Sequence, residues 1–155
     1  MVLDRDGLFG VDTPRTVGFF NEGNCTVSTG AFTGRLLGSV PAALWTSSLD
    51  GAPIATSKRL LLVHVADVQD EGTVYADATK QVLLRWGRLP HLMRRASAEV
   101  RIVLGEGAPC RVYALASDGT RRAELPVKQD GHSVSFTVDT GRDPNEATCY
   151  YEIVR

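Results

Sequence analysis

The sequence is short of cysteine, of net charge and of long apolar runs, and each shortage excludes a class of protein. Its three cysteines, Cys25, Cys110 and Cys149, form neither a CxxC pair nor a Cys/His ligand set, so we expect buried apolar side chains rather than a zinc site. A Cys110–Cys149 disulfide stays open, because both residues fall in expected strands near the end of the chain.

Charge and hydropathy exclude two further classes of partner. The formal net charge of -1 gives no electrostatic reason to expect nucleic acid or an anionic membrane surface. No apolar run approaches the ~20 residues of a membrane helix. The N-terminal segment MVLDRDGLFG holds no apolar signal-peptide core.

Catalytic motifs are missing too. The nucleophile elbow G-x-S-x-G does not occur, and the S-x-x-K pattern fails because Ala55 stands three residues before Lys58. Glycoside cleavage needs two carboxylates at a defined separation, and nothing in the sequence pairs the candidates Glu99, Glu124 and Glu146. The sequence therefore predicts no catalytic residue, no enzyme activity in this chain and no cofactor.

One acidic segment, DVQDEGTVYAD, is rich in oxygen ligands. It departs from the EF-hand consensus at Gln69, where Asp or Asn is required. We predict no metal site, and leave open a structural calcium ion held by loop carboxylates, with the candidates Asp67, Asp70, Glu71 and Asp77.

The feature that the chain does have is apolar patterning with a period of two residues. Turn signals such as Asp50-Gly51 and Asp118-Gly119 separate the runs. The expected strands fall at residues 7–13, 15–21, 40–49, 59–65, 98–104, 110–117, 121–127, 132–140 and 147–154. Many short strands at this spacing predict an all-β, antiparallel β-sandwich of two packed sheets, formed as a single domain over residues 1–155. Two segments, residues 77–87 and 89–99, are compatible with helices or with short strands and loops.

The stretch SSLDGAPIATSKRLLLVHVADV contains a Ser, a Lys and an Arg directly before an apolar strand. Without a recognisable base nearby, we interpret it as a structural corner. Ser57 is expected to hydrogen-bond turn backbone, while Lys58 and Arg59 lie at the sheet rim. His64, inside the strand, is expected to be buried and to bond a neighbouring carbonyl or hydroxyl.

The segment LLRWGRLPHLMRR is the most unusual in the chain. Trp86, flanked by Arg85 and Arg88, is a candidate platform for a sugar ring, with Tyr75 as a second aromatic. The alternatives are that Trp86 packs in the core beneath arginine stems, or that the segment binds nucleic acid, which the near-neutral charge disfavours. Trp45, inside an apolar strand, is expected in the core.

An ordered series of segments carries a family resemblance: FGVDTPRTVGFF, SSLDGAPIATSKRLLLVHVADV, GRLPHL, RVYALASDGTR and CYYEIV. It resembles the C-terminal β-sandwich domain of large bacterial proteins related to glycoside hydrolases, which carry a catalytic (β/α)-barrel upstream. The sequence departs from that pattern at QDEG, residues 69–72, and at Arg94-Arg95.

The resemblance implies a non-catalytic accessory domain, the last module of a longer protein, that packs on the barrel or touches carbohydrate beside it. The alternative is a carbohydrate-binding module that stacks sugar on exposed aromatics. The expected partners are the upstream catalytic domain and possible carbohydrate, with neither nucleic acid nor membrane. The compartment is unknown, and is extracellular or periplasmic if the parent protein is secreted.

Overall fold

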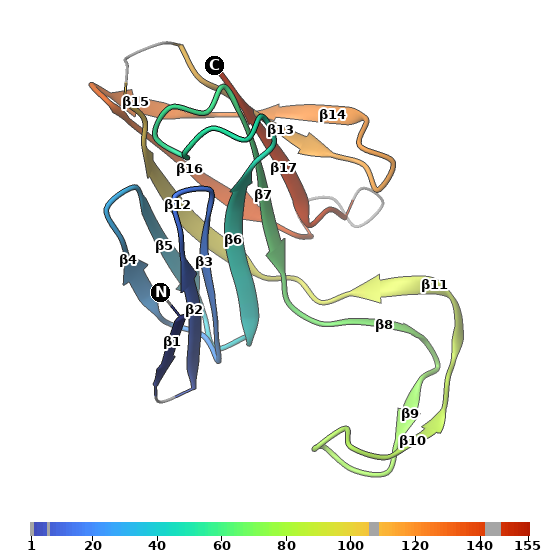
Figure 1. Ribbon diagram of the computed structural model, residues 1–155. Coiled ribbons are helices and arrows are strands. Elements are labelled where there is room, and N and C mark those ends of the chain that lie inside the picture. Colours follow the sequence, from blue (N-terminus) through green and yellow to red (C-terminus); the bar gives the residue numbers. More distant parts are fainter. Residues whose placement is uncertain (1, 6, 106–108, 142–146) are drawn as a thin grey trace.

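Two antiparallel β-sheets packed face to face form the body of the protein (Figure 1). The computed structural model describes residues 2–5, 7–105, 109–141 and 147–155, and these contain strands and turns but no helix. The all-β sandwich predicted from the sequence is therefore confirmed. Accordingly, no helix in the described residues is long and apolar enough to cross a membrane.

The larger sheet has eight strands in the order β1-β2-β3-β6-β7-β17-β13-β14. The C-terminal strand pairs with β7 on one side and β13 on the other, so the end of the chain is held in the middle of the sheet. The strands are β1 (Val2–Arg5), β2 (Leu8–Asp12), β3 (Thr16–Asn21), β6 (Ala42–Ser48), β7 (Arg59–Val65), β17 (Tyr150–Val154), β13 (Arg111–Leu115) and β14 (Arg121–Leu125).

The smaller sheet has five strands in the order β15-β16-β12-β5-β4. Its central strand β12 pairs with β16 over its whole length and with β5 from Ser97 to Ile102, in the register that the alternating sequence requires. The strands are β15 (Lys128–Asp130), β16 (Ser133–Asp139), β12 (Ser97–Val103), β5 (Phe32–Leu37) and β4 (Thr26–Ser28).

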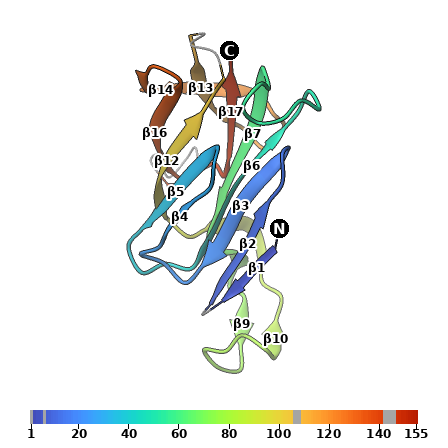
Figure 2. The same cartoon turned by 60° about the vertical axis from the view of Figure 1, so that its left-hand side comes forward.

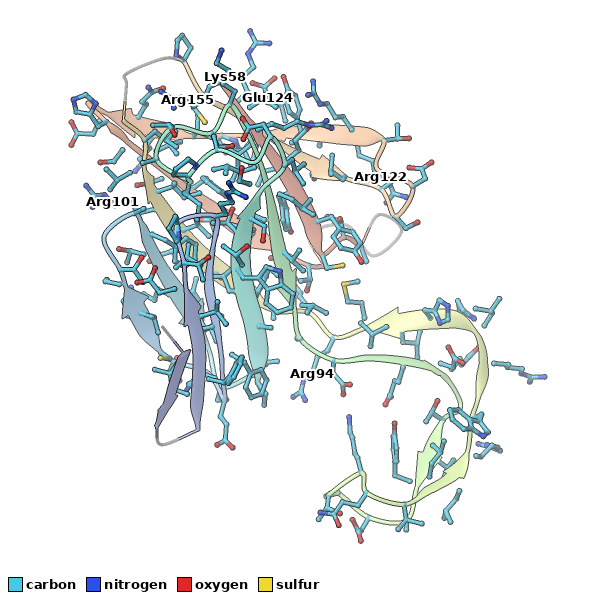
Figure 3. All side chains as sticks on the ribbon, viewed as in Figure 1. Lys58, Arg94, Arg101, Arg122, Glu124 and Arg155 are labelled. Atoms are coloured by element: carbon cyan, nitrogen blue, oxygen red, sulfur yellow. The ribbon has the colours of Figure 1, made fainter. Side chains whose placement is uncertain are left out.

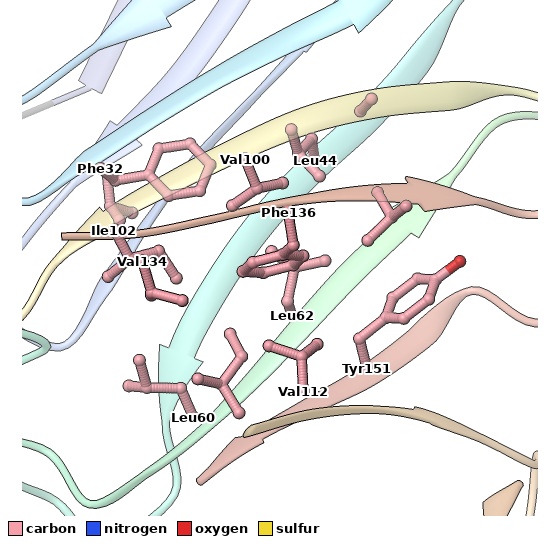
Figure 4. Close-up of a cluster of buried hydrophobic side chains, with 14 of the residues drawn as sticks. Phe32, Leu44, Leu60, Leu62, Val100, Ile102, Val112, Val134, Phe136 and Tyr151 are labelled. Atoms are coloured by element: carbon pink, nitrogen blue, oxygen red, sulfur yellow. The ribbon is translucent and has the colours of Figure 1, made fainter. Parts of the chain in front are cut away.

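Alternate side chains of both sheets fill the space between them. In Figure 4, Leu44 and Leu62 of the larger sheet lie near Val100 and Phe136 of the smaller one. Successive residues of a strand point to opposite faces, so each strand gives every second side chain to this core. A fully buried side chain of this size contributes about 1.5–3 kcal/mol. The body of the protein thus has a complete apolar core of its own.

Between β7 and β12 the chain leaves the sandwich as a long two-stranded ribbon. We call residues 67–94 the arm. It contains β8 (Val68–Glu71), β9 (Val74–Tyr75), β10 (Leu83–Arg85) and β11 (Arg88–Met93), paired β8 with β11 and β9 with β10. A hydrogen bond from the backbone N–H of Arg94 to the carbonyl of Asp67 (N···O 2.8 Å) closes its base. Figure 1 shows the arm standing clear of both sheets, and Figure 2 shows its tip, β9 and β10, beyond the ends of β1 and β2.

The two segments that the sequence left open between helix and strand, residues 77–87 and 89–99, form turns and strands. Gly87 has a φ of +76°, which a helix does not allow. A Cβ added at Gly87 would lie 2.6 Å from the carbonyl oxygen of Glu71 in the facing strand β8. Pro90 lacks the N–H that a helix interior requires. The hypothesis of a disulfide between Cys110 and Cys149 is wrong, because both are free thiols and each is buried within the sandwich.

Candidate interaction surfaces

The corner before β7 is held by the carboxylate of Asp50. Its Oδ1 accepts hydrogen bonds from the hydroxyls of Ser48 and Ser57 (both 2.8 Å), and its Oδ2 accepts the Lys58 N–H (2.7 Å). These bonds, the one from the Lys58 backbone first, hold the pKa of Asp50 well below its usual range. Ser57 is fully buried and also hydrogen-bonds the Arg59 backbone, so the backbone hydrogen bond predicted for Ser57 is confirmed.

His64 lies on the inward face of β7 and is fully buried. Its backbone N–H donates to the Cys149 carbonyl at 2.9 Å, but neither ring nitrogen has a hydrogen-bond partner among the described residues. The expected bond to a carbonyl or hydroxyl is therefore wrong. Burial lowers the pKa of His64 to about 4, against the attraction of Asp139. The ring is neutral at neutral pH and acts as a packed core group.

The four residues suggested as a sugar site all lie on the arm. Trp86 is 80% exposed, so the core alternative is wrong for this residue. The Nε of Arg85 donates a hydrogen bond to the Gly72 carbonyl at 2.8 Å. Arg88 stands opposite Glu71 in the ladder between β11 and β8. These two arginines border a small hollow of about 470 Å³.

Tyr75, the second suggested aromatic, already has a contact on its ring. The ammonium of Lys80 lies 5.7 Å from the ring centroid, within reach of a cation–π attraction. Lys80 also forms an ion pair with Asp67. One face of Tyr75 is therefore occupied from within the arm, and Trp86 is the aromatic of this pair that projects freely.

The arm is apolar as well as exposed. Of the 12 exposed large hydrophobic residues among those described, seven belong to the arm, so most of the uncovered apolar surface lies there. These seven are Val68, Val74, Val82, Leu84, Trp86, Leu89 and Leu92. Side chains project from both sides of the ribbon, and Arg94 marks its base (Figure 3). An isolated two-stranded ribbon is marginally stable in water at best, so this surface is one that a partner would stabilise.

A second apolar surface covers the outer face of the larger sheet near the origin of the arm. Two rows of cross-strand neighbours build it: Phe9, Phe20, Ala43 and Val65 form one row, and Trp45, Val63 and Tyr150 the other. We call these seven residues the sheet patch. Four of them are large and exposed, namely Phe9, Phe20, Trp45 and Tyr150.

The position of Trp45 differs from the prediction that it belongs to the core. Its side chain lies on the outer face and is 39% exposed, while its neighbours Leu44 and Thr46 point inward. Across the ladder stands Gly18, where an added Cβ would lie 1.9 Å from the Cβ of Trp45. The missing side chain of Gly18 makes room for the indole on the outside of the sheet.

Beyond the sheet patch, the same outer face becomes charged. The carboxylate of Glu152, 3% exposed, accepts hydrogen bonds from Arg59 (2.5 Å) and Arg121 (2.6 Å). Burial opposes its ionisation, but the hydrogen bonds and the positive charges of Arg121 and Arg59 together outweigh burial and lower the pKa of Glu152. The Arg121 guanidinium also lies over the Tyr113 ring, 4.3 Å from its centroid. This cluster ties β7, β14 and β17 together.

A hollow of about 1140 Å³ lies between β14 and the smaller sheet, and residues of β5, β12 and β16 line it together with β14. Two of its carboxylates hold ion pairs, Glu99 with Arg35 (3.4 Å) and Asp139 with Arg95 (2.8 Å). Burial opposes the ionisation of Asp139, yet the bonds from Arg95 and the backbone lower its pKa. A glycosidase general acid requires the opposite shift. The sequence analysis named Glu124 and Glu146 beside Glu99 as candidate carboxylates, and Glu146 lies outside the described residues.

Within the described part of the chain, no group of three or more His, Cys, Asp and Glu side chains lies close enough to hold a metal ion. Of the four carboxylates named for a calcium site, Asp67 pairs with Lys80, and Asp70 lies 2.5 Å from the Nδ1 of His91. Asp77 accepts the Thr79 N–H at 2.8 Å.

Comparison with known proteins finds no match: no protein-family model, no curated protein and no solved structure shows significant similarity to this chain. The structural assignment is therefore an all-β domain of two antiparallel sheets.

Proposed function

We propose that this chain is a non-catalytic accessory domain that works by protein–protein contact, within a glycoside-hydrolase-like protein whose catalytic barrel it supports. The sequence resemblance suggests the parent class. The arm is the observation that carries the docking role, because it concentrates exposed apolar surface on an element outside the sandwich.

The arm contributes nothing to the core of the domain. No residue of the arm belongs to the buried core cluster or packs against it among the described residues. An element that the fold does not use, and that exposes large hydrophobic side chains to water, is better explained by a contact with another surface than by stability.

A carbohydrate-binding module is the second candidate, and the exposure of Trp86 favours it. A sugar-binding module usually offers several aromatics around a common groove. Here Trp86 projects alone beside Arg85 and Arg88, and one face of Tyr75 is covered by Lys80. The geometry thus supports docking more strongly than sugar stacking.

Hydrogen–deuterium exchange on the full-length gene product tests the proposal. The arm amides are expected to be protected there and to exchange fast in the 155-residue chain at low concentration. A matched control without the arm replaces residues 68–93 by Asn-Gly. The hydrogen bond from the Arg94 N–H to the Asp67 carbonyl is already the bond that closes a two-residue turn, so Asn-Gly can connect these two residues. Fast exchange of the arm in the full-length product, or a gene that encodes no barrel, would contradict the accessory role.

Affinity electrophoresis against a polysaccharide panel separates the two candidates. We expect no retardation of the wild-type chain. Retardation by one polymer that is lost in Trp86→Ala would replace the docking proposal with the carbohydrate-binding module, and Leu49→Ala, also an exposed apolar residue but outside the arm, serves as the matched control.

A further inference from the structure

Two uncovered apolar surfaces on one chain raise the question of what covers them. The sheet patch extends across β2, β3, β6, β7 and β17, a width of about 19 Å at the usual spacing between strands. The arm begins just after Val65, at the edge of the patch, and points away from the sandwich (Figures 1 and 2). The arm of one chain therefore does not lie on the patch of the same chain.

We propose that the arm of one chain lies across the sheet patch of a second copy, and that the two copies exchange arms about a two-fold axis. The proposal rests on the docking role proposed above and names the arm's partner. In a two-fold dimer, each copy offers the same two surfaces, so one symmetric arrangement covers one side of each arm and both patches.

The dimensions of the two surfaces agree. One leg of the arm, residues 68–76, reaches about 30 Å when extended, which is enough to cross a patch about 19 Å wide.

The buried area also reaches what a stable dimer needs. Aromatic side chains present about 150–250 Å² in full, so the exposed parts of the four patch aromatics offer about 300 Å². The arm residues that face the patch offer an area of the same order. Two such contacts, counted on both partners, bury on the order of 1,200 Å², at the lower end of the range of about 1,200–2,000 Å² that is typical of specific interfaces.

Part of the charge at this contact is already compensated. The sheet patch contains no charged side chain, and within the arm Lys80 forms an ion pair with Asp67, while the Asp70 carboxylate lies 2.5 Å from Nδ1 of His91. The Arg85 guanidinium donates to the Gly72 carbonyl. Because these groups already have partners, laying the arm on an apolar surface leaves fewer charges to be desolvated alone.

Sedimentation velocity of the 155-residue chain, over a range of concentrations, tests the exchange. We expect a monomer–dimer equilibrium for the wild type. An arm variant, Leu84→Ser with Trp86→Ser, and a patch variant, Phe20→Ser with Trp45→Ser, are each expected to be monomeric. Leu49→Ser, which removes an exposed leucine outside both surfaces, is the matched control and is expected to dimerise like the wild type.

Mixing the two variants gives the sharpest result. A heterodimer of one arm variant and one patch variant retains one of the two contacts, since the intact arm meets the intact patch. We expect association of the mixture, weaker than that of the wild type, although neither variant associates alone. Circular dichroism of each variant confirms that the loss of dimer is not a loss of fold.

Three results would overturn the exchange: a monomeric wild type at every concentration, a dimer that survives either variant, or a mixture that stays monomeric. A monomeric chain whose arm is nevertheless protected in the full-length gene product would identify another surface of that protein as the occupant. The exchange would then be wrong while the docking role stands.

Discussion

Replacing His64 by leucine tests the energetic cost of a buried imidazole without partners. Both ring nitrogens lack hydrogen bonds among the described residues, and the side chain is fully buried. An unsatisfied buried polar group costs about 1–3 kcal/mol, and leucine is close to histidine in size. We therefore expect His64→Leu to stabilise the fold by about 1–3 kcal/mol at neutral pH, as measured by urea unfolding.

The same residue predicts how stability depends on pH. The pKa of His64 falls from 6.5 to about 4 on folding, because burial disfavours the imidazolium. The unfolded chain therefore binds the proton more readily, and stability is lost as the pH falls from 6.5 toward 4. Each pH unit of that interval corresponds to about 1.4 kcal/mol, so the full loss is about 3 kcal/mol.

The measurement is the free energy of unfolding of wild type and His64→Leu at a series of pH values. Acids whose pKa is lowered, such as Asp50, Asp139 and Glu152, also destabilise the fold on acidification, and apart from the attraction between His64 and Asp139 this effect is common to both proteins. The difference between the two curves thus isolates His64 and should widen between neutral pH and pH ~4. His132→Gln, at an exposed position, is the control. Parallel curves, or a leucine variant no more stable than the wild type, would refute the reasoning.

Three further substitutions test the corner, the outer face and the ion cluster. Ser57→Ala removes a buried hydroxyl from the Asp50 network and should destabilise the fold by about 1–2 kcal/mol in urea, whereas Thr56→Ala, at an exposed neighbour, should not. Gly18→Ala places a Cβ against Trp45 and should lower the melting temperature, with an overpacking cost of at least about 1–3 kcal/mol; an unchanged melting temperature would contradict the close approach. Glu152→Gln should cost about 1–3 kcal/mol at neutral pH. Because the pKa of Glu152 is lowered on folding, this cost should shrink as the pH falls through 4.5, and a pH-independent cost would contradict the ion cluster.

The strands of the sandwich were predictable where apolar and polar residues alternate without conflict. Residues 98–104 alternate in this way, and β12 occupies Ser97–Val103 with Ala98, Val100 and Ile102 inward. The corner at Asp50-Gly51 was predictable for a local reason, since Gly51 has the positive φ of +76° that this turn requires.

The outer face was not predictable from one strand alone. In AALWTSS, both Leu44 and Trp45 are apolar, so alternation cannot decide which of them points inward. The decisive signal lies on another strand, where Gly18 leaves space for the indole, and the sequence does not show that the two are neighbours. The same limit applies to the disulfide, because proximity along the predicted strands does not fix the distance between two thiols.

The arm was missed because its sequence carries no dominant period. Its apolar residues fall in both registers of the ribbon, with register shifts between Arg88 and His91 and between Leu83 and Arg85. A strand buried on one face would show alternation, and a solvated loop would be polar, but this segment is neither. Apolar residues on both sides of an exposed ribbon suit an element that is to be covered by another surface.

The arm is not needed to connect β7 to β12. Asp67 and Arg94 already form the hydrogen bond of a tight turn, so two residues would complete the path from the larger sheet to the smaller one. The additional residues supply nothing to the core, and they expose an apolar ribbon that invites aggregation. The proposed exchange of arms would give this exposed ribbon a partner, since the sheet patch at its origin is an apolar surface that one extended strand of the arm is long enough to cross.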